Sequence, residues 1–187
     1  EPNKKFDAVN IENFEGGKIA TEHLVSLGHK KITHVAGPSD GYEGQMRRNG
    51  YEKAMNDAKL KTDVIEGDWS IESGYSAGLQ IAARRERPTA VFTTNDHQAL
   101  GFIKALAEKA ISVPGDISIV AFDDIPEAAY FSPALTTVRQ DFDQLGNIAI
   151  NRMMAQLKEP VKSSAYTIKP ELVVRDSTQS ITKSKGK

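Results

Sequence analysis

Cysteine is absent from this 187-residue chain, which excludes disulfides and thiolate chemistry and fits a reducing compartment. No apolar run is long enough to cross a bilayer, and residues 1–5 do not resemble a signal peptide. The first residue is not Met, so we expect the chain to begin inside a longer protein. Together these features predict a cytoplasmic protein with no membrane contact.

Neither sign of charge dominates the chain. Lys and Arg number 24 against 25 Asp and Glu, a net charge of −1, and the two signs are interspersed. A nucleic-acid-binding surface usually shows as a basic patch or stripe, and this sequence has none. If the parent protein contacts DNA, we expect a region outside this chain to do so.

The common catalytic motifs are also missing. The sequence has no Walker-type phosphate loop, no G-x-G-x-x-G fingerprint and no G-x-S-x-G elbow. Its histidines follow no metal-ligand spacing: His23, His29, His34 and His97. We therefore expect no catalytic residue, no metal and no cofactor. One enzymatic alternative stays open, in which Asp96, Asp123 and Asp124 hold a divalent cation.

What the chain does have is a regular alternation of strand-like and helix-like segments. Apolar runs predict strands at 31–36, 64–65, 89–93 and 116–122. Helical apolar spacing predicts helices around 19–27, 46–58, 71–82 and 95–109, with Ser70 and Asn95 as N-caps. This rhythm predicts an α/β fold, a parallel sheet with right-handed crossovers and helices on both faces.

The pattern changes after Pro126. We expect an extended segment at 134–138, then a helix from about 142 to 157 with Leu145, Ile148, Ala149 and Met153 facing inward. Short strands at 166–168 and 172–174 are expected to close the fold. The polar, lysine-rich residues 177–187 are predicted to be a disordered tail.

Five polar or aromatic residues fall at or just beyond the expected carboxyl ends of the strands: Arg47, Trp69, Asn95, Asp123 and Gln140. In a parallel sheet these positions converge on one edge, where α/β proteins bind ligands. A bidentate donor, a flat apolar ring, an amide and a carboxylate suit a hydroxyl-rich small molecule.

Each of these residues also has an ordinary structural role open to it. Trp69 could fill core, Arg47 could be a surface cation, and Asn95 could serve only as a helix cap. Asp123 could be a turn residue and Gln140 a solvated one. Their joint placement favours the ligand-binding interpretation, because a random scatter would not put all five at one edge.

Seven segments in order resemble the LacI/GalR family of bacterial transcription regulators, over about residues 7–178: residues 21–32, 47–51, 66–69, 87–92, 95–96, 113–124 and 133–140. The resemblance implies a fold like that of the type I periplasmic binding proteins, in which two lobes close on an effector. Arg47 would then hydrogen-bond the effector and Trp69 would stack on it. Asn95 and Asp123 would contact hydroxyls or ring nitrogens.

The same resemblance implies that Gln140 lies near the crossover between lobes and that Ile11 makes an apolar contact where the chain enters this lobe. Trp69 looks more like the sugar-responsive members than the purine-responsive one, where phenylalanine is expected. A sugar is therefore favoured over a nucleoside or purine as effector.

The resemblance further implies that the helix-turn-helix and most of an amino-terminal lobe lie upstream. Residues 1–138 would form the carboxyl-terminal lobe, 139–163 would return to the other lobe, 164–176 would be closing strands and 177–187 the tail. The protein would act as a homodimeric repressor on operator DNA. The expected dimer residues are Leu100, Ile103, Tyr130 and Phe131.

One alternative function remains open from the sequence, a periplasmic sugar-binding protein that serves a transporter. Two departures from the family pattern also stand out, because Ala110 and Ala121 occupy positions where glycine is common. Ala110 weakens the expected left-handed helix stop, and Ala121 adds a methyl group near the pocket floor.

Overall fold

The computed structural model describes residues 8–158 and 165–181. The elements, in chain order, are β1 (Ala8–Ile11), α1 (Asn13–Ser26), β2 (Ile32–Val35), α2 (Tyr42–Asp57), β3 (Val64–Ile65), α3 (Ile71–Ala82), β4 (Ala90–Thr93), α4 (Asp96–Glu108), β5 (Ser118–Asp123), the 3-10 helix η1 (Pro126–Tyr130), β6 (Thr136–Arg139), α5 (Phe142–Lys158), β7 (Ala165–Ile168) and β8 (Glu171–Val173). The expected strands are confirmed to within two residues at each end. The sequence reasoning missed β1 and η1.

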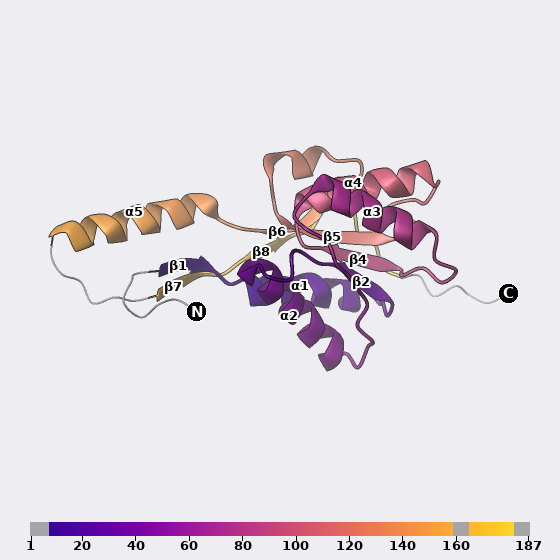
Figure 1. Cartoon of the computed structure of the whole chain (residues 1–187), viewed down its shortest axis with the longest axis horizontal. Coiled ribbons are helices and arrows are strands. Elements are labelled where there is room, and N and C mark those ends of the chain that lie inside the picture. The colour runs from indigo at the N-terminus through magenta and orange to yellow at the C-terminus, as the bar shows by residue number, and fades with distance from the viewer. Residues whose placement is uncertain (1–7, 159–164, 182–187) are drawn as a thin grey trace.

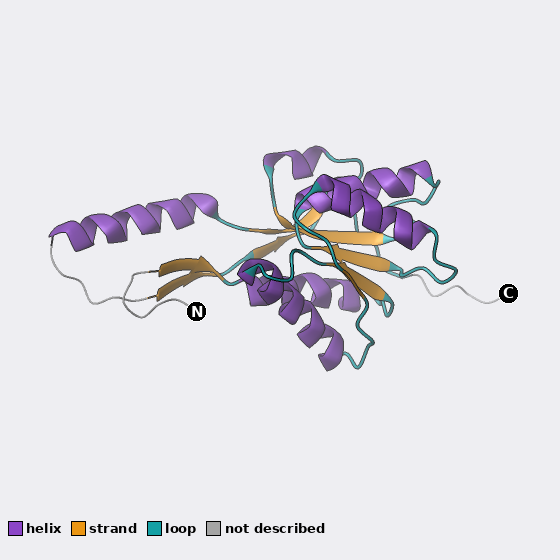
Figure 2. Cartoon of the chain, viewed as in Figure 1, coloured by secondary structure: helices purple, strands orange, loops and turns teal. Residues whose placement is uncertain are grey.

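A six-stranded sheet in the order β3-β2-β4-β5-β6-β8 forms the centre of the molecule. Its first five strands run parallel, and β8 pairs antiparallel with β6. Helices α1 and α2 cover one face, while α3 and α4 cover the other (Figures 1 and 2). The predicted α/β fold with helices on both faces is confirmed, and the carboxyl ends of β2 to β6 share one edge.

Both helix pairs pack closely because glycines face the neighbouring backbone. A Cβ added at Gly17 would lie 2.1 Å from the carbonyl oxygen of Arg47, and one at Gly50 would lie 2.1 Å from that of Phe14. In the other pair, a Cβ at Gly101 would lie 2.0 Å from the carbonyl oxygen of Ile71. Any side chain at these positions would push the helices apart.

An arm made of α5 and the parallel pair β1–β7 extends away from the sheet (Figure 1). The expectation that β7 helps to close the fold was wrong, since only β8 joins the main sheet and Pro170 interrupts the chain between them. Residues 8–11 likewise belong to the arm rather than to the lobe expected over 1–138.

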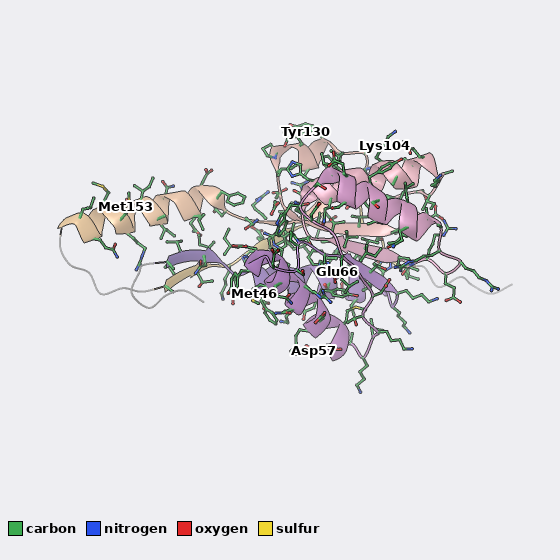
Figure 3. All side chains as sticks on the ribbon, in the orientation of Figure 1. Met46, Asp57, Glu66, Lys104, Tyr130 and Met153 are labelled. Carbon is green, nitrogen blue, oxygen red and sulfur yellow. The ribbon has the colours of Figure 1, made fainter. Side chains whose placement is uncertain are left out.

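The outer side of α5 carries exposed apolar side chains. Met153, expected to face inward, is 57% exposed and projects from the arm in Figure 3. Ala149 is also exposed, whereas Leu145 and Ile148 are half-buried. The predicted inward positions of Met153 and Ala149 were wrong, because no layer of described residues covers this part of α5. Helical spacing alone identifies an apolar side and does not show what covers it.

The predicted disordered tail begins too early. Ser177 is fully buried, its hydroxyl donates to the carbonyl of Ile119 at 2.7 Å, and it accepts from the amide of Thr136 at 2.8 Å. The amide of Ile181 then donates to the carbonyl of Leu27 at 2.9 Å. Hydrogen bonds therefore hold residues 177–181 against the rest of the protein, which their polar composition did not reveal. Residues 182–187 lie outside the described residues.

The two alanines that replace expected glycines are accommodated differently. Ala110 adopts a φ of +53°, so it does form the left-handed stop after α4, a conformation that costs a residue with a Cβ roughly 1 kcal/mol. Ala121 is fully buried and packs in the apolar cluster under α3 and α4.

Candidate ligand-binding site

The five residues expected at the carboxyl edge do meet there, around Arg47. This side chain comes from α2 and is 4% exposed. Its Nη1 donates to the carbonyl of Thr94 at 2.7 Å and lies 3.3 Å from Oδ1 of Asp123, the last residue of β5. Arg47 is therefore not a surface cation. It forms a buried ion pair with Asp123 at the carboxyl ends of the strands.

Asp123 joins Arg47 to Gln140, the residue that follows β6. Gln140 Nε2 donates to the same Oδ1 of Asp123 at 2.5 Å. Asp123 has a φ of +117°, a backbone conformation that costs a non-glycine residue about 1–3 kcal/mol and commonly marks functional sites. The strained backbone turns this carboxylate toward the polar cluster.

Two aromatic rings complete the surroundings of the guanidinium. The Arg47 Cζ lies 3.8 Å from the ring centre of Phe122 and 5.4 Å from that of Trp69. Trp69 is 37% exposed, so it is not a core plug. One edge of its ring packs against Gly37 and Gly44, where an added Cβ would lie 3.2 Å and 3.4 Å from the ring. The rest of the indole accounts for the exposed surface.

Asn95 is confirmed as the N-cap of α4 and also belongs to the cluster. Its Oδ1 accepts from the amide of Gln98 at 2.8 Å, and its Nδ2 donates to the carbonyl of Trp69 at 3.0 Å. One N–H of the side-chain amide therefore holds the Trp69 loop.

Burial works against both charges of the central ion pair. It lowers the pKa of Arg47, although Asp123 and Glu43 oppose this. Burial also raises the pKa of Asp123, outweighing the nearby Arg47 and the hydrogen bond from Gln140. The two shifts agree that desolvation exceeds the gain from a single 3.3 Å contact. Additional polar partners from a ligand would stabilise both ions.

The sequence reasoning missed two supporting amides. Asn13 Oδ1 accepts from Nε of Arg47 at 2.8 Å, and nothing in the sequence signals this contact. Gln98 is fully buried, with Oε1 accepting from the amide of Thr94 at 3.1 Å and Nε2 donating to the carbonyl of Ala36 at 3.0 Å. Its place three residues after the cap Asn95 is a capping-box spacing that could have identified it.

Ile11 reaches the cluster through its backbone. Its carbonyl accepts from Nδ2 of Asn13 at 3.2 Å, and Asn13 in turn holds Arg47. The side chain lies half-buried on β1, in register with Ile168 of β7. Ile11 therefore marks the junction between the arm and the lobe.

Asp96 is a buried carboxyl beside the cluster. Its Oδ1 accepts from the Thr137 hydroxyl at 2.6 Å and its Oδ2 from the amide of Ile125 at 2.8 Å. Burial raises the pKa of Asp96 to about 7, with Asp123 and Asp124 adding to the rise. Folded protein then binds a proton that the unfolded chain releases near pH 4, so the contribution of Asp96 to stability is lost as pH rises toward 7.

Replacing Asp96 by Asn should therefore flatten the pH dependence of stability. Between pH 5 and 8 we expect the natural protein to lose about 2–3 kcal/mol more than the Asp96→Asn variant. Urea unfolding of both proteins at the two pH values measures the difference. Parallel losses in both proteins would show that Asp96 does not titrate in this range.

The three carboxylates of the enzymatic alternative are held by hydrogen-bond donors. Asp96 and Asp123 are engaged as described, and Asp124 accepts from Nε of Arg139 at 2.6 Å and Nη2 of Arg175 at 2.7 Å. Within residues 8–158 and 165–181 no group of three His, Asp or Glu residues is arranged to hold a metal ion.

No helix within residues 8–158 and 165–181 is long and apolar enough to span a membrane.

The expected dimer residues lie on the side of the molecule covered by α3, α4 and η1. Leu100 is 41% exposed and Tyr130 88% exposed, and Tyr130 and Lys104 are labelled together on this side in Figure 3. Ile103 and Phe131 are half-buried against the core beneath. Leu100 and Tyr130 are thus exposed on this surface, while Ile103 and Phe131 pack beneath it.

The lobe gathers a cation, a carboxylate, an amide and a half-exposed indole at the carboxyl edge of a parallel sheet, which is where α/β proteins of this kind commonly bind small molecules. The sequence profile described as periplasmic binding protein-like domain matches residues 21–178. The chain belongs to this family. It is similar to the effector-binding regions of LacI/GalR-type regulators.

Individual relatives agree with this assignment. The chain is 40% identical to the HTH-type transcriptional repressor PurR of Haemophilus influenzae (strain PittEE). The match covers 96% of this chain and 56% of the repressor. It thus spans about half the length of the curated relatives it matches.

Two solved structures share the fold. A LacI family regulator from Enterococcus faecium with bound ribose matches at a TM-score of 0.91 and 27% identity, over 97% of this chain and 69% of that one. The lac repressor dimer bound to operator and the anti-inducer ONPF matches at a TM-score of 0.84 and 33% identity. The match covers 91% of this chain and 60% of that one.

Proposed function

We propose that this chain is the effector-sensing and dimerising part of a DNA-binding transcription repressor. The observation that carries the proposal is the buried Arg47–Asp123 pair at the carboxyl edge, flanked by the half-exposed Trp69. Arg47 offers donors and Asp123 offers acceptors, a combination that binds vicinal hydroxyls or a polar ring edge, while the indole covers an apolar face. The proteins named above are transcription regulators, which favours this proposal over the transporter alternative.

A sugar or sugar-like molecule is our first choice of effector, and a purine or nucleoside is the second. Trp69 provides a broad flat face beside the Arg47 guanidinium, which suits the apolar face and the hydroxyls of a sugar. The ribose-bound regulator from Enterococcus faecium supports the first choice. The PurR relatives support the second, so the ligand panel in any test needs both classes.

We further propose that the arm belongs to a second lobe that closes over this edge. The exposed apolar face of α5 and the isolated pair β1–β7 would be covered by that lobe, and Ile11 and Gln140 lie where the chain crosses between the two. Homodimerisation would use the α4 and η1 side, and operator DNA would be bound by a helix-turn-helix outside this chain. We place such a regulator in the cytoplasm.

Effector binding changes operator affinity only if the effector prefers one of the two regulator states. In the full-length protein, Asp123→Asn should leave operator affinity unchanged and weaken the effector response by about tenfold or more, since it removes the acceptor charge without changing size. Asparagine also tolerates the positive φ of this position. Fluorescence anisotropy on labelled operator DNA, with increasing effector, measures both quantities.

The matched control is Asp57→Asn, the same substitution at an exposed residue at the end of α2. It should respond to effector like the natural protein. An Asp123→Asn protein with an unchanged effector response would contradict the proposal, whereas loss of operator binding would assign Asp123 to folding.

A further inference from the structure

A hollow of about 550 Å³ lies at the other end of the parallel strands, away from the Arg47 cluster. Its walls come from the loops that follow α1, α2 and α3 and lead into β2, β3 and β4. Asp57, the last residue of α2, marks this end of the helix in Figure 3. The volume falls within the usual range of small-molecule pockets.

Positive charge predominates in this amino-edge hollow. Five cations and two carboxylates line it, a net charge of +3: Lys30, Lys31, Lys59, Lys61 and Arg84 against Asp63 and Glu86. Both carboxylates are already paired, Glu86 with Lys31 at 2.9 Å and Asp63 with Arg84. Lys30, Lys59 and Lys61 have no carboxylate partner among the described residues, so their charge is available to a ligand.

Apolar side chains form part of the same surface. Pro88 is buried, Leu60 is half-buried, and Ile32 contributes from the start of β2 with 1% exposure. The aliphatic stems of the lysines extend this apolar area toward the rim. A purely inorganic anion would leave the apolar floor unused, whereas an organic anion would cover it.

Asp63, on the same loop as Lys59 and Lys61, is held in place by the buried core. The Asp63 carboxylate accepts from the Thr33 hydroxyl at 2.5 Å and from Arg84. The hydroxyl of the fully buried Tyr51 accepts from the Asp63 amide at 2.9 Å and donates to the carbonyl of Ile32 at 2.9 Å. Burial alone would raise the pKa of Asp63, but the hydrogen bonds from Arg84 and Thr33 hold it below its ordinary value. Asp63 therefore stays ionised and fixes Arg84.

We propose that the amino-edge hollow binds an organic polyanion of nucleotide size, as a second ligand site separate from the effector edge. Phosphate groups lie against Lys30, Lys59 and Lys61, where compact ammonium groups serve as point charges. The organic body covers Leu60 and Pro88. The volume of about 550 Å³ and the apolar floor favour one small molecule over an acidic protein segment.

The test uses isothermal titration calorimetry of the protein with metal-free ATP, adenosine and inorganic pyrophosphate at physiological ionic strength. We expect saturable ATP binding, with adenosine and pyrophosphate each weaker by about tenfold or more, because each lacks half of the contacts. The double variant Lys59→Gln/Lys61→Gln should bind ATP about tenfold more weakly. The control Lys109→Gln/Lys169→Gln, which removes two exposed lysines outside the hollow, should bind like the natural protein.

Trp69→Ala separates the two edges of the sheet. It should leave ATP affinity unchanged, since Trp69 is not part of the amino-edge hollow. Absence of saturable ATP binding, equal weakening in both lysine double variants, or loss of ATP binding in Trp69→Ala would each overturn the proposal. So would pyrophosphate affinity equal to that of ATP, or saturable binding of a poly-glutamate peptide without binding of ATP.

Discussion

Arg47→Ala should lower the free energy of unfolding by about 3–5 kcal/mol, because it leaves a buried charge unpaired. The Oδ1 of Asn13 and the carbonyl of Thr94 would lose the donor that Arg47 provides. The carboxylate of Asp123 would lose its cation and keep only the hydrogen bond from Gln140. The loss is a large fraction of the 5–15 kcal/mol typical of a folded domain. Chemical denaturation monitored by circular dichroism measures it.

Arg48→Ala is the matched control for this variant. Arg48 is the neighbouring residue on α2, and its side chain is 29% exposed and pairs with Glu52 and Glu66. Such surface pairs contribute about 0–1 kcal/mol, so we expect little change. Equal losses for the two variants would mean that the buried Arg47–Asp123 pair does not stabilise the fold and that the cluster is not a preformed site. For this reason Asp123→Asn, rather than Arg47→Ala, is the cleaner probe of effector binding.

Gly17→Ala should have the second largest effect, although it adds only a methyl group. The added Cβ would lie 2.1 Å from the carbonyl oxygen of Arg47, so α1 and α2 would have to separate at the residue that holds the site. We expect a loss of about 3 kcal/mol, in the upper range for overpacking. Effector affinity should fall with it by about tenfold, because Arg47 moves with its helix.

Gly146→Ala controls for the change in helix propensity. An added Cβ at Gly146 on α5 has nothing within 4 Å, so the substitution should raise stability by up to about 1 kcal/mol. Denaturation of the two variants side by side gives the comparison. Gly17→Ala with natural stability would contradict the close α1–α2 packing.

Much of the fold follows from local sequence patterns. Strands such as β4 and β5 are short apolar runs bounded by turn residues, and the caps Ser70 and Asn95 combine a suitable side chain with a following apolar period. The arm could not be predicted in this way. Pairing of β1 with β7 joins segments far apart in the chain, and no local property of residues 8–11 specifies that partner.

The candidate site was partly predictable for a related reason. Parallel topology brings the ends of β2 to β6 together, so residues just after each strand, such as Asp123 and Gln140, had to converge. The sequence could not show that Arg47 is buried between Phe122 and Trp69, because that depends on how closely Gly17 and Gly50 let α1 and α2 approach. Asn13 and Gln98 support the site through contacts that depend on the same packing.

Fluorescence titration of Trp69 tests the central claim most directly, since it is the only tryptophan of the chain. The full-length protein would be titrated with a panel of sugars, purines and nucleosides, with Trp69→Phe as the blank for any other fluorophore. We expect a saturable change in fluorescence with one ligand class. The change should be absent from the blank, and the ligand affinity should be about tenfold or more weaker in Asp123→Asn. A ligand that controls operator binding yet leaves Trp69 fluorescence unchanged, with equal affinity for Asp123→Asn, would contradict the assignment of this edge as the effector site.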